Sequence, residues 1–160
     1  MRIHLLAIGT RMPGWVSAGY QDYAQRLPHE CRLHLIEIAP APRTKGTDLA
    51  RAVREEGERM LDLIPKDAHV IALDVRGTQY STEQLSAQLN GWLQNGQDVA
   101  LLIGGPDGLA PTLHDKAALR LAFGALTWPH QLARIMLLEQ VYRAITIRLY
   151  WNNQPTIGSL

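Results

Sequence analysis

The sequence is poor in cysteine, with Cys31 the only one among its 160 residues. A single cysteine excludes a disulfide within the chain and a metal site built from several cysteines. Cys31 lies between Glu30 and Arg32 in a strand-like stretch, a setting more typical of a packed thiol than of a nucleophile. We therefore expect a protein without disulfides and without a bound metal.

The sequence also lacks a marked excess of charge of either sign. Its 16 Lys and Arg residues stand against 15 Asp and Glu residues, which gives a formal net charge of +1. This balance gives no strong general attraction to nucleic acid, so any such binding must come from local patches. Solvated loop charge is the alternative interpretation of the basic residues that could form these patches. They are Arg11, Arg43, Lys45, Arg51 and Arg54.

A long uninterrupted hydrophobic run is missing. The most apolar late segment, residues 135–151, contains Glu139, Arg143 and Arg148, and such charges are costly inside a bilayer. The opening residues 1–8 are short and alternating, unlike a secretory signal peptide. The sequence predicts no membrane span and a cytoplasmic location.

No internal repeat, low-complexity tract or long linker divides the chain. Its length suffices for one core, and an apolar fraction of 46% is typical of a globular protein. We therefore expect a single domain over residues 1–160. Strand-like and helix-like stretches alternate along it, which predicts an α/β fold with a mainly parallel sheet covered by helices on both faces.

The limits of the predicted elements follow from hydrophobic periodicity and capping signals. Asp48 can cap one helix, and Ser81 with Gln84 has the spacing of a capping box at the start of the next. Residues 74–78 are expected to form a loop. We expect strands at 2–8, 32–38, 69–73, 99–103 and 124–128, and helices at 13–27, 48–63, 81–95, 111–121 and 131–150.

The clearest functional signal is the stretch 101–109, where an apolar strand breaks into a turn with three glycines and a proline. Open α/β sheets bind ligands where such strands end, and glycine lets bare backbone groups approach a ligand closely. A second loop of this kind follows at 125–130. An ordinary strand-to-helix turn uses the same residue types, so the first segment alone leaves both interpretations open.

The turn after the first strand, residues 9–14, matches neither the dinucleotide-binding nor the P-loop glycine pattern. The candidate ligand loops come late in the chain instead, after the third, fourth and fifth strands. Their apolar walls and backbone hydrogen-bonding groups suit an adenine and a ribose better than a triphosphate. The residues expected to line this site are Leu73, Gly104, Gly105, Gly124, Ala125, Leu126, Thr127, Trp128 and Pro129.

Several stretches of the sequence occur together in one known family. They are the opening 7–16, the strand 35–38, the loops 101–109 and 125–130, and Arg134 with Tyr142, Arg143 and Ala144. In this combination the chain, over about residues 1–147, resembles the RlmH family. Members of that family are SPOUT methyltransferases that modify N3 of a pseudouridine in 23S ribosomal RNA.

The resemblance implies S-adenosylmethionine as the cofactor, bound by the late loops, and a deep trefoil knot within about residues 70–150. It also implies a homodimer. The partner would be large-subunit ribosomal RNA, within the assembled ribosome.

The chain departs from the family pattern at three places. Asp107 stands where the family usually has Glu, and Trp128 stands where it usually has Leu. The family typically ends in a His-Pro-Tyr-His-like tail, whereas residues 154–157 here read Gln-Pro-Thr-Ile. The altered tail leaves an alternative to an active methyltransferase, namely a cofactor- or ribosome-binding homologue with impaired catalysis. An unrelated α/β enzyme that binds another nucleotide in the glycine loops is a third interpretation.

The candidate catalytic residues are His130, Arg134 and Arg143. The target nitrogen carries a proton at neutral pH, so a base, or a positive charge that stabilises the anion, would help. His130 lies in a candidate loop, although a histidine after a proline at a helix start is often structural. Arg143 follows Glu139 by four residues, so an ion pair within the helix is the simpler interpretation. No catalytic role is assigned from the sequence alone.

The last predicted helix bears on assembly because its apolar residues cover more than one stripe. They are Leu132, Ile135, Met136, Leu138, Val141, Tyr142, Ile145 and Leu149. One face is expected to pack in the core of the subunit, and a second subunit is a natural cover for another. This pattern adds to the expectation of a homodimer.

Overall fold

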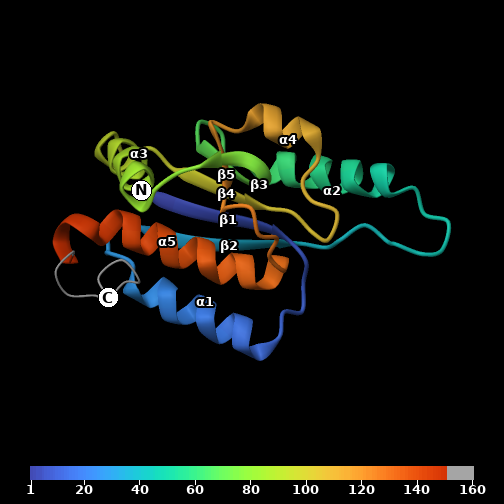
Figure 1. Cartoon of the computed structure of the whole chain (residues 1–160), viewed down its shortest axis with the longest axis horizontal. Helices are drawn as coiled ribbons and strands as arrows, with labels where there is room; N and C mark the ends of the chain where they lie inside the picture. The colour runs from blue at the N-terminus through green and yellow to red at the C-terminus, as the bar shows by residue number, and fades with distance from the viewer. Residues whose placement is uncertain (151–160) are drawn as a thin grey trace.

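The computed structural model of the chain describes residues 1–150, and the side chains of residues 1–147 among them (Figure 1). The atypical tail, including residues 154–157, lies outside the described residues. Five strands form one sheet in the order β2-β1-β4-β3-β5, with every neighbouring pair parallel. The strands are β1 (Arg2–Ile8), β2 (Arg32–Ile38), β3 (His69–Gln79), β4 (Val99–Ile103) and β5 (Leu119–Ala122).

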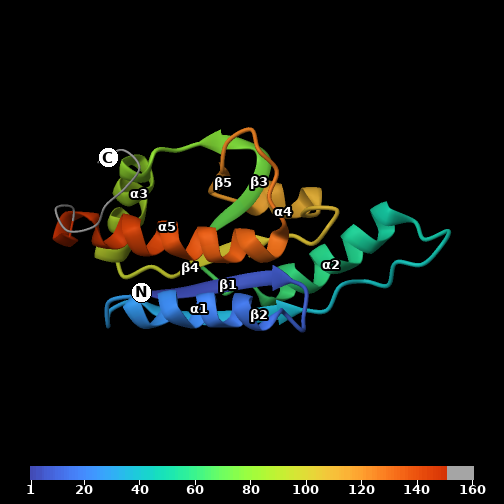
Figure 2. The ribbon, with the colours of Figure 1, turned by 60° about the horizontal axis from the view of Figure 1, so that its bottom comes forward.

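Helices cover both faces of this sheet (Figure 2). One face carries α1 (Gly14–Arg26), α3 (Thr82–Gln94) and α5 (His130–Tyr150), and the other carries α2 (Leu49–Leu63) and α4 (Pro111–Lys116). The predicted α/β class with a parallel, doubly covered sheet is therefore confirmed.

Alternation along the central strands builds a separate core on each face of the sheet. In β1, Leu5 packs into the core beneath α3 and α5, while Leu6 packs into the core beneath α2 and α4. Leu101 and Leu102 of β4 divide in the same way. Side chains that alternate across a strand need apolar cover on both sides, which explains why β4 is buried at every position.

Two predicted capping signals are confirmed in atomic detail. The Asp48 carboxylate accepts hydrogen bonds from the backbone N–H groups of Ala50 and Arg51, which fixes the start of α2. Ser81 and Gln84 form a reciprocal capping box at the start of α3. Cys31 is buried, as expected of a packed thiol, and burial raises its pKa.

The limits predicted for residues 111–128 were wrong. The helix expected at 111–121 ends at Lys116, and the fifth strand is Leu119–Ala122 instead of 124–128. Residues 124–128 connect this strand to α5. The reason is long-range pairing. Leu119 to Ala122 pair with β3 in a parallel ladder, and these residues could not do so within a helix.

The predicted loop at 74–78 was also wrong, since β3 continues through it to Gln79. The pairing with β5 shifts register between Leu73 and Thr78, and β3 curves there (Figure 2). Gly77 makes this possible, because a Cβ at that position would lie 2.4 Å from the backbone oxygen of Arg120. The strand therefore contains an irregularity that only glycine accommodates.

The broad apolar surface of α5 is largely covered within the chain. Helices α1 and α3 flank α5 on its two sides, and the sheet lies beneath it. Gly19 of α1 allows the side chain of Ile135 to pack closely, because a Cβ at Gly19 would lie 2.8 Å from Ile135 Cδ1. The apolar width of this helix is thus no evidence in itself for a second subunit. Within residues 1–150, no helix combines the length and apolar character needed to cross a membrane.

A close contact between α2 and the start of α4 provides a test of the packing. A Cβ at Gly57 would lie 2.4 Å from the Cβ of the buried Ala110. We expect Gly57→Ala to lower the free energy of unfolding by roughly 1–3 kcal/mol, because the two helices must move apart. Urea denaturation of the purified protein measures this change.

The matched control is Gly91→Ala in α3, where a Cβ would meet no atom within 4 Å. Alanine there should raise the free energy of unfolding by about 0.5–1 kcal/mol, since it restricts the unfolded chain without a clash. Equal effects of the two substitutions would contradict the close packing of α2 on α4.

Candidate functional site

An open hollow of about 130 Å³ lies where β3, β4 and β5 end, beside the start of α5. The carboxyl ends of parallel strands meet at one edge of a sheet, so turns far apart in the sequence come together there. The residues that line the hollow are Leu73, Asp74, Val75, Ile103, Gly104, Gly105, Gly108, Leu121, Phe123, Gly124, Leu126, Trp128, His130 and Ala133.

The turn after β4 forms the most compact wall of this hollow. A Cβ at Gly104 would lie 2.5 Å from the backbone carbon of Gly108, so no side chain fits between the two sides of the turn. Gly108 donates its N–H to the Gly105 carbonyl at 3.0 Å and has a positive φ of 81°. The turn therefore presents backbone rather than side chains to the hollow.

The loop between β5 and α5 adds apolar side chains that are open to solvent. Leu126 is 70% exposed and Trp128 is 38% exposed, although both line the hollow. Exposed large apolar side chains beside a concave site are typical of a surface that a ligand covers. Together with the backbone of the glycine turn, they suit a flat, partly apolar ligand with a few polar groups.

Most residues predicted for the ligand site line this hollow. Leu73, Gly104, Gly105, Gly124, Leu126 and Trp128 do so, whereas Ala125, Thr127 and Pro129 are not among the lining residues. Sequence reasoning missed Asp74, Val75, Ile103, Gly108, Leu121, Phe123 and Ala133. Asp74 could have been predicted, because a polar residue directly after a buried strand lies at the edge of the sheet where ligands bind.

Asp74 is the acidic group at the hollow. Its carboxylate accepts hydrogen bonds from the backbone N–H of Arg76 at 3.0 Å and from the Arg120 guanidinium, whose Nε is 3.0 Å away. His114 Nε2 lies 3.7 Å from the same carboxylate. Burial raises the pKa of Asp74, but these hydrogen bonds and nearby positive charges outweigh it, so the pKa lies below its ordinary value. Asp74 is therefore a carboxylate at neutral pH.

His130 begins α5 and lines the hollow, as its place in the sequence predicted. Its Nδ1 is buried and has no hydrogen-bond partner within the described part of the chain. Burial lowers the pKa of His130, and the charge of Arg134 lowers it further. The imidazole is therefore neutral at pH 7 and keeps a nitrogen that can accept a proton.

Arg134 does not line this hollow. Its side chain is buried and donates to Glu37 and to the Gly9 carbonyl, each at 2.9 Å, which ties α5 to the ends of β1 and β2. With Arg11 and Glu37 it borders a second hollow between α1 and β2. Arg11 and Met12 of the early turn line this second hollow, whereas no residue of 9–14 lines the first.

Arg143 is also absent from the lining of the hollow. Its Nε donates to the Glu139 carboxylate at 2.8 Å. This ion pair within α5 is the simpler alternative that the spacing of the two residues predicted. Across residues 1–150, no group of His, Cys, Asp and Glu side chains is arranged to hold a metal ion.

Comparison with known proteins places this geometry in a family. A family model described as a predicted SPOUT methyltransferase matches residues 1–153. A relative from Thioalkalivibrio sulfidiphilus named ribosomal RNA large subunit methyltransferase H is 53% identical over 144 residues, which cover 90% of this chain and 92% of the relative. A relative of the same name from Methylococcus capsulatus is 46% identical over 155 residues, 97% of this chain and 98% of the relative.

Among solved structures, a methylase family protein from Neisseria gonorrhoeae superposes with a TM-score of 0.53 at 12% identity. The match covers 96% of this chain and 84% of the other, and it shows a shared fold. The family match and the two relatives confirm the resemblance stated from the sequence motifs. The chain therefore belongs to the SPOUT methyltransferases, within the group of relatives named ribosomal RNA large subunit methyltransferase H.

Proposed function

We propose that this protein is an S-adenosylmethionine-dependent methyltransferase that modifies N3 of a pseudouridine in 23S ribosomal RNA, in the assembled ribosome of the cytoplasm. One observation carries the proposal. The hollow lies at the late turns after β3, β4 and β5, in a chain about half identical to large-subunit RNA methyltransferases.

The residues at the hollow fit the cofactor. The backbone of the Gly104–Gly108 turn offers hydrogen-bonding groups, and Leu126 and Trp128 offer apolar cover for an adenine. The Asp74 carboxylate can accept hydrogen bonds from ribose hydroxyls or face a positive charge. When bound, S-adenosylmethionine supplies a methyl group on a positively charged sulfur, which makes that methyl open to attack by a nitrogen.

The chain's own residues would mainly align the two reactants and exclude water, because methyl transfer is an in-line displacement. His130 is the candidate that the geometry favours for holding the proton of the target nitrogen, since it lines the hollow and is neutral at pH 7. Arg134 pairs with Glu37 and Arg143 pairs with Glu139, and neither arginine lines the hollow. Their proposed part is structural rather than catalytic.

We also propose that residues 1–160 form a single domain. Within it, about residues 70–150 would form a deep trefoil knot. The two cores on opposite faces of one sheet support a single domain. Membership of the SPOUT methyltransferases, for which the sequence resemblance implied a knot, supports the knotted arrangement.

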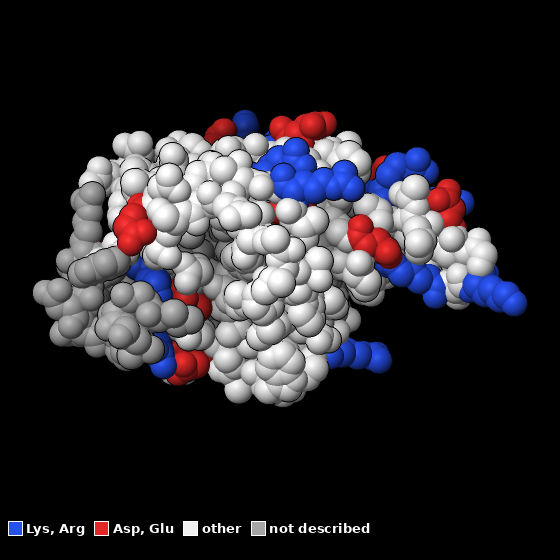
Figure 3. Space-filling view, viewed as in Figure 1, with Lys and Arg blue, Asp and Glu red and all other residues white. Residues whose placement is uncertain are grey.

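A homodimer is the proposed assembly. In Figure 3 the part of the surface near the starts of α1 and α5 carries few charged side chains, whereas acidic and basic side chains lie toward the other ends of these helices. Trp15, at the start of α1, is 55% exposed. A second copy of the chain would cover this weakly charged face.

The direct test is transfer of a labelled methyl group from S-adenosylmethionine to ribosomes from a strain that lacks this modification. We expect label in the large-subunit RNA, at a pseudouridine. Ribosomes that already carry the methyl group are the control and should take up none. Binding of S-adenosylmethionine without transfer would favour the alternative, a binding homologue impaired by its tail, and absence of binding would contradict both.

The hollow can be tested through Leu126. Because its side chain is 70% exposed, Leu126→Ala should leave the free energy of unfolding nearly unchanged. Loss of a large apolar contact to the ligand should raise the dissociation constant of S-adenosylmethionine about tenfold. Calorimetric titration measures this, with Leu63→Ala as control, since Leu63 is also exposed but lies on α2 away from the hollow. Unchanged affinity in Leu126→Ala would place the cofactor elsewhere.

The assembly can be tested by sedimentation velocity at micromolar concentration. We expect a mass twice that of the 17.9 kDa chain. Trp15→Glu should shift the protein toward monomer, because it places a charge on the weakly charged face. A stable monomer in the unaltered protein would exclude the dimer.

A further inference from the structure

The loop between β2 and α2, with the first turns of α2, forms a projection that we call the arm, residues 39–54. Both ribbon views show it reaching out beyond the end of the sheet (Figures 1 and 2). The side chains of Lys45, Arg51 and Arg54 are exposed on it. In Figure 3, Lys and Arg side chains gather at this end of the molecule, with fewer acidic ones between them.

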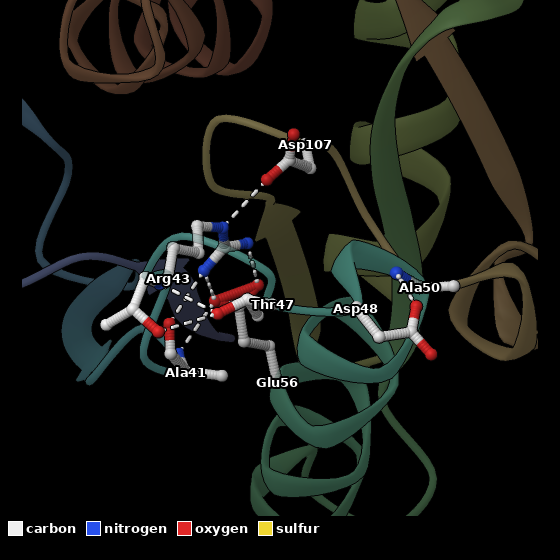
Figure 4. A network of polar contacts seen from close by, with 8 residues as sticks. Ala41, Arg43, Thr47, Asp48, Ala50, Glu56 and Asp107 are labelled. Atoms are coloured by element: carbon white, nitrogen blue, oxygen red, sulfur yellow. Dashed lines mark hydrogen bonds and ion pairs between the residues drawn. The ribbon is translucent and has the colours of Figure 1, made fainter.

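A buried carboxylate holds the base of the arm (Figure 4). Glu56 of α2 is 2% exposed and accepts a hydrogen bond from the Ala41 backbone N–H at 3.0 Å. It also accepts two from the Arg43 guanidinium, each at 2.8 Å. A buried charge with three donors is costly to leave unpaired, so the arm keeps a defined shape at its base.

The same arginine reaches the glycine turn of the hollow. Arg43 Nε donates to the Asp107 carboxylate at 2.7 Å (Figure 4). Asp107 does not line the hollow, but Gly105 and Gly108 on either side of it do. Within the described residues, this is the one side-chain hydrogen bond between the arm and the turn. Arg43 therefore connects the arm to the turn that lines the hollow.

We propose that the arm contacts the phosphate backbone of the ribosomal RNA substrate, and that the Arg43–Asp107 ion pair couples this contact to cofactor binding. The inference rests on the proposed function and extends it to how the substrate is held. Exposed Lys and Arg side chains on a projecting loop suit phosphates. The Arg43 guanidinium contacts both the turn that would hold the cofactor and the arm that would hold RNA. Cofactor binding is therefore coupled to RNA binding, and such coupling acts in both directions.

The contact is tested by charge reversal on the arm. The double substitution Lys45→Glu with Arg54→Glu should weaken binding to whole ribosomes at least tenfold and reduce its salt dependence, while the affinity for S-adenosylmethionine stays unchanged. The control is Lys66→Glu, an exposed lysine just beyond the opposite end of α2. Ribosome binding unchanged by the double substitution would overturn the contact, and would leave the arm for a protein partner instead.

The coupling is tested by measuring ribosome affinity with and without saturating S-adenosylhomocysteine, which cannot transfer a methyl group. The unaltered protein should bind about fivefold or more tightly with it. Asp107→Ala removes the tie to the turn and leaves the Arg43–Glu56 contact in place, so the difference should vanish. Asp107→Glu keeps a carboxylate and should preserve it. Glu55→Gln, which removes an ion pair with Arg51 away from the turn, is the matched control.

Two outcomes would overturn the coupling: an equal effect of S-adenosylhomocysteine in the unaltered protein and in Asp107→Ala, or no effect in either. These results are distinct from failure of the proposed function. If the unaltered protein methylates ribosomal RNA while Asp107→Ala retains the full cofactor effect, only the coupling is wrong. If the unaltered protein neither binds S-adenosylmethionine nor transfers a methyl group, the proposed function itself is wrong.

Discussion

Direct contact of backbone against backbone, at two glycines, shapes the edge of the sheet on which the hollow lies. Gly104 lets the turn after β4 close on Gly108, and Gly77 lets β3 run against Arg120 of β5. A side chain at either glycine would push apart the segments that form the walls of the hollow. The parallel sheet supplies the common edge, because strands distant in the sequence end side by side there. The walls of the hollow and the packing of the strands thus depend on the same two close backbone contacts, at Gly104 and Gly77.

The sequence was sufficient to predict the features that arise from local rules. The alternation of strand-like and helix-like stretches predicted the sheet and its double cover, and the caps at Asp48 and Ser81 predicted two helix starts. The late position of the turns that line the hollow was predicted from the strand ends and the glycines. The limits of β5 could not be predicted in this way, since a strand of four residues is stabilised by its ladder with β3 rather than by its own propensity.

The two arginines show the same division between local and distant partners. The Glu139–Arg143 pair within α5 could be predicted from spacing alone. Arg134 could not, because its partners Glu37 and Gly9 lie 97 and 125 residues away in the chain. The Arg43–Asp107 contact spans 64 residues and was likewise invisible to local reasoning. Arg143 thus pairs within its own helix, whereas the fold brings Glu37 to Arg134 and Asp107 to Arg43 from distant parts of the chain.

The buried state of Cys31 has a practical consequence. Because this thiol is the sole one in the chain, lies in the core and has a raised pKa, ordinary maleimide reagents should find little thiolate to attack in the folded protein. A cysteine introduced on an exposed surface would then be the single position that takes up a fluorophore or spin label. The native cysteine would therefore not have to be removed before a label is attached. Spectroscopy of such a label could follow the movement of an outlying segment.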